Sequence, residues 1–236
     1  MKNIILVLFL CLPMIIFCQN DNFQIAIYTG PNVMFRTNEL IKDTYKPAIG
    51  YQFGVATLIP LKPEKLYIQT SIQFSNYAEK FGGDDLRWGA QHDGMGGFDE
   101  TLQSGDASIL DGQVNNFFLD IPIGVRYYFN QGKWRFFTQP SVDLSYYLTR
   151  RTSIKFTLSD LETEVIESIS SGGLNDFRTI NLAGSLGFGV ERNISEKLSI
   201  FFQPTATMHL FSTAKNSVTD SKLYAISGRM GINIKM

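Results

Sequence analysis

The chain has 236 residues, of which 44% are hydrophobic, and its 21 basic side chains nearly balance its 22 acidic ones. This near-neutral charge gives no support for nucleic-acid binding, and only two cysteines and two histidines are present for thiol or transition-metal chemistry. The length is sufficient for one large all-β domain.

The first 18 residues have the pattern of a secretory signal peptide. Lys2 supplies the positive charge, and residues 4–12 form the apolar run. We expect cleavage near Cys18, which leaves a mature domain over residues 19–236. Acylation of Cys18 is the alternative, but the bulky Phe17 stands where lipoprotein signals have a small residue. Both cysteines lie in the signal, so we expect no disulfide in the mature chain.

Eight stretches of the mature chain alternate apolar and polar side chains. In chain order they cover residues 23–35, 46–61, 66–77, 117–129, 134–149, 178–192, 198–211 and 223–235. The links alternate in length, with long ones at 36–45, 78–116, 150–177 and 212–222 and short ones at 62–65, 130–133 and 193–197. Short periplasmic turns and longer extracellular loops are typical of outer-membrane barrels. The sequence therefore predicts an all-β fold, an eight-stranded antiparallel up-and-down transmembrane β-barrel.

The polar face of the alternation distinguishes a membrane barrel from a soluble lipocalin-like barrel, which is the alternative. After Lys65 the apolar face includes Leu66 and Ile68, while Tyr67 and Gln69 begin the opposite face. A soluble barrel would present many Lys and Glu side chains to water on one of its faces. Gln, Ser, Gly and Tyr dominate here instead, as in a narrow polar lumen. We therefore place the apolar face in lipid and the polar face inside.

Aromatic residues of the outward face gather at two levels. They flank one short turn and also lie toward the long loops: Phe129, Trp134 and Phe136 in the first group, and Phe35, Phe74, Phe117, Tyr146 and Tyr224 in the second. Membrane interfaces favour two such belts. Localisation in the outer membrane of a Gram-negative envelope is the expectation.

The run from Phe118 to Phe129, with Asp120, Pro122 and Arg126, resembles a strand of the PorT-like outer-membrane β-barrel family of Bacteroidetes. Residues 46–61 and 185–200 are similar to two further hairpin segments of that family. The resemblance implies an eight-stranded outer-membrane barrel and, through the family's name, suggests an accessory role in type IX secretion.

Six charged residues share the inward face and occur in equal numbers of each sign. They are Asp120, Asp143 and Glu191 against Arg126, Arg135 and Arg229. An unpaired charge in a narrow interior is destabilising, so we expect structural ion pairs that plug the lumen rather than an ion path. Asp120 and Arg126 are expected to pair with charges on a neighbouring strand, with Arg135 and Asp143 as the candidates.

A lipid-modifying enzyme is the second functional alternative, because His209 lies on the inward face and Ser212 follows it closely. Residues three apart on a strand point to opposite faces, so His209 is expected to be a hydrogen-bonded interior residue and not a catalytic base. We predict no catalytic residues and no cofactor.

The two longest links carry the features expected to mediate binding. Seven carboxylates lie between residues 84 and 111 without the spacing of a helix-loop-helix calcium site, which favours a solvated acidic loop over a metal site. In the later link, Ile154 and Phe156 continue the strand pattern, and Val165 and Ile169 are positioned to pair back as a projecting hairpin. We expect a monomer, non-enzymatic and not a pore, that contacts outer-membrane lipid and binds an extracellular or envelope protein through 78–116 and 150–177.

Overall fold

The computed structural model describes residues 23–36, 46–62, 64–81, 85–88, 91–92, 98–99, 105–158, 164–170, 178–212 and 222–236. Every regular element in these ranges is a β-strand. In the described ranges there is no helix of the length and apolarity that a transmembrane helix needs. The predicted signal peptide lies outside them.

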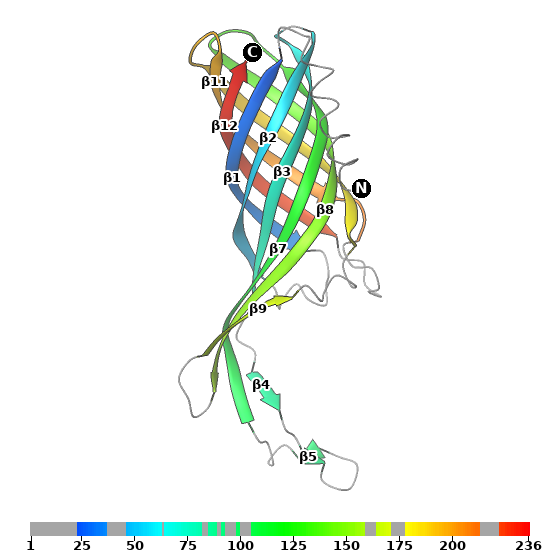
Figure 1. Ribbon diagram of the computed structural model, residues 1–236, viewed down its shortest axis with the longest axis vertical. Coiled ribbons are helices and arrows are strands. Elements are labelled where there is room, and N and C mark those ends of the chain that lie inside the picture. Colours follow the sequence, from blue (N-terminus) through cyan, green and yellow to red (C-terminus); the bar gives the residue numbers. More distant parts are fainter. Residues whose placement is uncertain are drawn as a thin grey trace, which may run out of the picture.

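Eight strands form a closed barrel in which each strand pairs antiparallel with the next (Figure 1). The strands are β1 (Gln24–Arg36), β2 (Lys46–Lys62), β3 (Leu66–Phe81), β7 (Gly105–Tyr128), β8 (Trp134–Leu158), β10 (Ile180–Asn193), β11 (Leu198–His209) and β12 (Leu223–Lys235). Pairing between β1 and β12 closes the wall. The predicted fold class is confirmed.

Burial alternates along the barrel strands as the period of two requires. In β11, for example, Ser199, Phe201 and Gln203 are buried inside, while Ile200 and Phe202 are exposed on the outer wall. The predicted assignment of the polar face to the lumen is therefore correct. The outward aromatic residues also lie as predicted, with Phe129, Trp134 and Phe136 more than half exposed around one turn.

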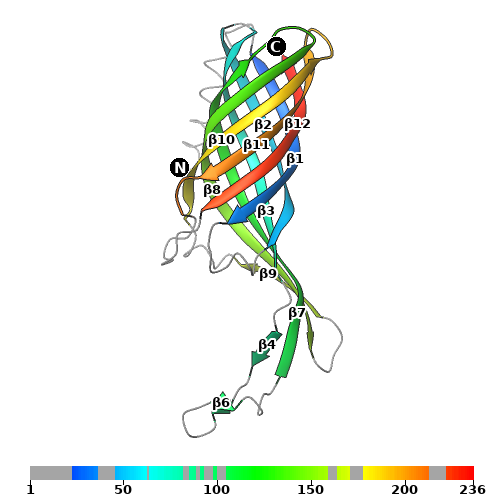
Figure 2. The same ribbon diagram turned by 180° about the vertical axis from the view of Figure 1, so that it is seen from behind.

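The short turns gather at one end of the barrel, here called the turn end, together with both ends of the described chain (Figures 1 and 2). The backbone N–H of Met236 donates to the carbonyl of Phe23 at 3.1 Å. In the turn between β7 and β8, the Asn130 side chain bonds the backbone of Trp134 and Phe136, both at 2.7 Å. Gly132 follows with a φ of 124°, a conformation that glycine adopts without strain.

Strands β7 and β8 continue beyond the other end of the barrel, the loop end, as a paired ribbon (Figure 2). β4 (Asp85–Trp88) adds to β7, and β9 (Glu164–Ser170) adds to β8. We call residues 105–111 and 150–158 with β4 and β9 the extension. The short strands β5 (Gln91–His92) and β6 (Phe98–Asp99) pair with each other.

The extension confirms one prediction and corrects another. The projecting hairpin exists, since Ile154 pairs with Ile166 and Phe156 with Glu164. The expectation that 78–116 is a single link is wrong, because β3 runs to Phe81 and β7 begins at Gly105. Strand pairing with β8 continues beyond the barrel, so backbone hydrogen bonds are available to a segment rich in Gly and Asp.

Candidate functional site

The six predicted lumen charges all point inward and are no more than 4% exposed: Asp120, Asp143, Glu191, Arg126, Arg135 and Arg229. They do not form one network. Three of them meet near the turn end, and the other three lie in the middle of the barrel without an ion pair.

Glu191 is the centre of the turn-end group, which we call the Glu191 cluster. Its carboxylate forms ion pairs with Arg135 and, at 3.8 Å, with Arg126. The Tyr128 hydroxyl, the Ser199 hydroxyl and the Asn233 amide donate to the same carboxylate at 2.5, 2.6 and 2.8 Å. Four hydrogen-bond donors and the nearby Arg126 cation therefore surround one buried anion, which is the arrangement that a buried carboxylate requires.

Strand register explains which charges meet. Glu191 and Arg135 are direct cross-strand partners on β10 and β8. Arg126 instead faces Gln139, whose side-chain oxygen accepts from the guanidinium at 3.0 and 3.1 Å. The expectation that Asp120 and Arg126 pair with Arg135 or Asp143 is therefore wrong. Inward parity alone does not give the depth of a side chain along the barrel axis, and register sets that depth.

Asp120 and Asp143 accept hydrogen bonds from neutral donors in the middle of the lumen, although Oδ1 of Asp120 is buried without a partner. The Ser75 hydroxyl donates to Asp120 at 2.6 Å. Ser141 donates to Asp143 at 2.7 Å, and the Ser185 hydroxyl donates to it as well. In the described part of the chain, none of the ion pairs within 4 Å includes Asp120, Asp143 or Arg229. Arg229 instead lies over the Tyr28 ring at 5.4 Å.

Two aromatic layers enclose this polar belt. The turn-side layer joins Tyr67, Tyr128, Phe137 and Phe201 with smaller apolar side chains. The loop-side layer joins Tyr77, Phe118 and Tyr147 with Met34, Leu223 and Ala225. Ring centroids in the layers lie 5.3 to 6.4 Å apart. Most of these ring pairs join neighbouring strands, and Phe137 with Phe201 joins β8 to β11. The rings therefore pack side by side inside the barrel, as in small barrels filled by side chains.

His209 belongs to the loop-side layer. It is 1% exposed, and its ring lies 5.9 Å from Phe118 and 6.5 Å from Tyr77. The predicted interior position is correct. The expected hydrogen bond is not found at Nδ1, which is buried without a partner. An imidazole held between rings is suited to packing rather than to proton transfer.

The loop end carries an ion pair that sequence reasoning missed. The Arg36 guanidinium on β1 donates two hydrogen bonds, of 2.5 and 2.6 Å, to the Glu79 carboxylate on β3. Arg36 lies one residue beyond the predicted end of its strand, and Glu79 lies in a segment predicted to be a link. The inward parity of both would have revealed the pair if the two strands had been extended.

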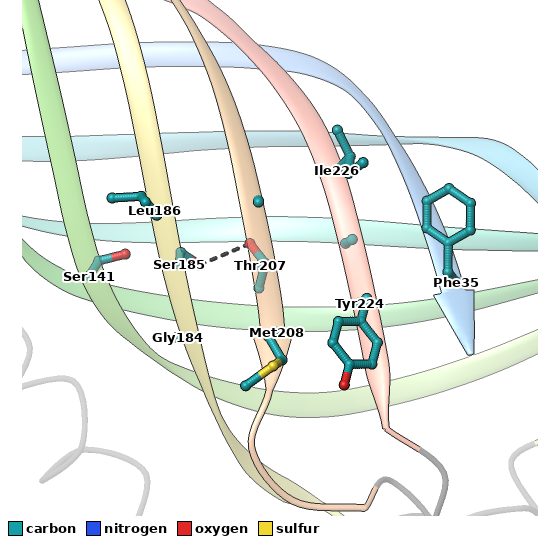
Figure 3. A pocket seen from close by; sticks show the side chains of 11 residues that line it. Phe35, Ser141, Gly184, Ser185, Leu186, Thr207, Met208, Tyr224 and Ile226 are labelled. Atoms are coloured by element: carbon teal, nitrogen blue, oxygen red, sulfur yellow. Dashed lines mark hydrogen bonds between the residues drawn. The ribbon is translucent and has the colours of Figure 1, made fainter. Parts of the chain in front are cut away.

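The outer wall carries a shallow depression of about 530 Å³ near the loop end (Figure 3). Gly184, Leu186, Ala206, Met208 and Tyr224 are among the residues that line it. The depression faces lipid, because these residues have outward parity. Behind it, the hydroxyl oxygens of Ser185 and Thr207 lie 2.9 Å apart in the wall. No set of converging polar groups suggests a reaction there.

No group of three or more potential metal ligands occurs among the described residues. The side chains of the acidic segment 84–111 lie outside the described part, so the expectation of a solvated acidic loop stays a prediction. Asp106 and Asp111 belong to strand β7 and not to a loop.

Comparison with known proteins gives a family match. The sequence model of the outer membrane protein beta-barrel domain matches residues 17–211. This model describes barrels in general, so the finer resemblance to PorT-like proteins stays a prediction. None of the curated proteins compared with the chain matches it.

Three of the solved structures that are similar to this chain are the following. Neisserial surface protein A is 11% identical, with 90% of this chain and 97% of that one covered and a TM-score of 0.44. Ail, the attachment invasion locus protein of Yersinia pestis, is 10% identical over 89% and 98%, with a TM-score of 0.38. The outer membrane protease OmpT of Escherichia coli is 8% identical over 92% and 97%, with a TM-score of 0.42.

Proposed function

The chain belongs to the outer membrane protein beta-barrel domain family, and from this premise we propose that it is a non-conducting, non-enzymatic barrel that binds a protein partner through its extension. An exported precursor with a signal peptide over residues 1–18 is part of this proposal. The observation that carries it is the pairing of β4 and β9 onto β7 and β8 beyond the barrel.

The extension supports binding because its outer strands have open edges. In the described chain, β9 pairs with β8 on one side only, and β4 pairs with β7 on one side only. An unpaired strand edge presents N–H and C=O groups that a partner strand can bond. The closed barrel has no such edge and provides a rigid support for the extension.

The packed lumen supports the absence of conduction. Two aromatic layers and the Glu191 cluster occupy successive depths of the barrel, and eight strands leave room for little more than side chains.

Site-specific photo-crosslinking in living cells tests the binding proposal. A photoreactive residue at Ser168 in β9 should yield a protein adduct, whereas the same residue at Glu196 in a turn should not. Replacing residues 82–111 by a two-residue turn removes β4 but keeps the barrel, because Phe81 already pairs with Gly112. This replacement should reduce the adduct. Absence of any adduct at Ser168 contradicts the proposal.

The resemblance to PorT-like proteins supports an alternative role as an accessory component of the type IX secretion machinery. Deleting the gene distinguishes the two roles. A secretion component predicts that secreted proteins accumulate in the periplasm, and a binding barrel predicts normal secretion. The enzyme alternative predicts altered acyl chains in extracted lipid A, whereas we expect none.

A further inference from the structure

The turn end of the barrel carries a ring of cations. Six basic side chains lie there, and we call them the turn-end collar: Lys62, Lys65, Lys133, Arg192, Lys197 and Lys235. Glu64 and Glu196 are the acidic side chains of the same segments. Four of the lysines are exposed, and Arg192 and Lys235 are half-buried.

The collar extends around the whole circumference. Lys62 and Lys65 flank the turn between β2 and β3, and Lys133 lies in the turn between β7 and β8. Arg192 and Lys197 flank the turn from β10 to β11, and Lys235 ends β12 beside β1. Because chain neighbours are also barrel neighbours, each quarter of the rim has at least one cation.

The collar cations are not neutralised within the described chain. The ion pairs found there join Arg36, Arg126 and Arg135 to acids and include none of the collar residues. With Glu64 and Glu196 included, the rim keeps a net positive charge, and its self-repulsion is unfavourable unless counter-charges approach from outside.

Two collar cations lie on outward aromatic rings. The Lys65 ammonium is 5.7 Å from the centre of the Tyr127 ring, and the Arg192 guanidinium is 5.2 Å from that of Trp134. Outward aromatic rings mark the level of the lipid headgroups, and long basic side chains above them reach toward phosphates. These cations therefore lie at headgroup height on the lipid-facing side.

We propose that the turn-end collar binds anionic phospholipid headgroups and enriches them around the turn-side rim. This site goes beyond the proposed function, because it lies at the opposite end of the molecule from the extension. The outward position of the Lys65 and Arg192 pairs favours a lipid over a soluble acidic protein, which would approach along the barrel axis. Each contact contributes about a fivefold enrichment, equivalent to about 1 kcal/mol per cation.

Trp134 provides a probe inside the collar. The sequence has two tryptophans, and the other, Trp88, lies in β4 beyond the barrel. In a Trp88→Phe background reconstituted in vesicles, lipids brominated in their acyl chains quench Trp134 only when adjacent to it. We expect brominated phosphatidylglycerol to associate about fivefold more strongly than brominated phosphatidylcholine, with the preference falling as salt is raised.

A collar variant combines Lys62→Gln, Lys65→Gln, Lys133→Gln and Arg192→Gln. We expect brominated phosphatidylglycerol and brominated phosphatidylcholine to associate with this variant about equally. The matched control removes four exposed cations at the loop end: Lys46→Gln, Lys80→Gln, Arg151→Gln and Arg178→Gln. The control should keep the preference. If the fourfold collar variant fails to fold, Lys62→Gln with Lys65→Gln should still reduce the preference. Equal association of both lipids in the background protein, or an unchanged preference without the collar, overturns the proposal.

Discussion

Glu191 is the residue whose loss should affect folding most. Its side chain is fully buried and compensates the buried guanidiniums of Arg126 and Arg135. Glu191→Ala leaves both cations without an anion, and removing one member of a buried pair typically costs about 3 to 5 kcal/mol. We expect a lower unfolding midpoint in detergent, measured by urea titration.

Glu196→Ala is the control for this substitution, because Glu196 is exposed in the turn that follows the same strand. It should change the midpoint little. Asp120→Ala should have an intermediate effect, since the donors it leaves behind, Ser75 and Gln73, are uncharged. Similar midpoints for Glu191→Ala and Glu196→Ala would show that the Glu191 cluster does not stabilise the barrel.

Gly189 and Gly184 allow a second comparison on one strand. A Cβ at Gly189 would lie 2.2 Å from the Phe137 ring, whereas a Cβ at Gly184 would meet nothing within 4 Å. Gly189→Ala must displace Phe137 in the turn-side layer, and such overpacking costs about 1 to 3 kcal/mol. Gly184→Ala should leave the unfolding free energy unchanged or raise it by about 0.5 to 1 kcal/mol. The reverse order would contradict the described packing of the lumen.

Residue-level prediction from the sequence succeeds for the face of a side chain and fails for its depth. Parity correctly places all six charges inside, because the period of a strand is fixed. The partners of Asp120 and Arg126 are predicted wrongly, because they depend on how neighbouring strands align. The short turns and the register shifts in the β2–β3 and β7–β8 pairs set this alignment, and the sequence leaves it open.

At the scale of elements, the extension should determine where proteases act on intact cells. Proteinase K should cut within residues 82–112, where links join short strands outside the barrel, and the paired barrel strands should stay protected. The turns at 62–65 and 131–133 should be cut only after the outer membrane is permeabilised. Cleavage of these turns on intact cells would show that the barrel has the opposite orientation. The extension would then face the periplasm and could not be an external binding surface.

The element boundaries show why long strands are harder to predict than short ones. β11 and β12 begin at the predicted residues, because a tight turn or a polar link precedes each. β7 and β8 extend beyond the membrane-spanning part, where neither lipid nor lumen imposes alternation. Gly105 and Asp106 therefore resemble loop residues although β4 pairs with both of them.

For the whole molecule, the filled lumen predicts that the barrel does not conduct ions. Purified protein in planar bilayers should give no stable ohmic current, because the two aromatic layers lie in series. The sample should also migrate differently before and after boiling on a gel, which verifies that the barrel is folded when conductance is measured. A steady single-channel current from protein with this heat-dependent migration would falsify the plugged lumen.

Pairing between β1 and β12 has a consequence for biosynthesis. Gln24 bonds opposite Lys235, so the seam of the cylinder joins residues from opposite ends of the described chain. Until β12 has been translated and exported, β1 and β11 each have an edge that nothing in the chain can saturate, and a hydrocarbon environment does not tolerate such edges. Insertion must therefore follow synthesis rather than accompany it. A polypeptide that stops before Leu223 should accumulate as an aggregation-prone precursor and not as a smaller membrane protein.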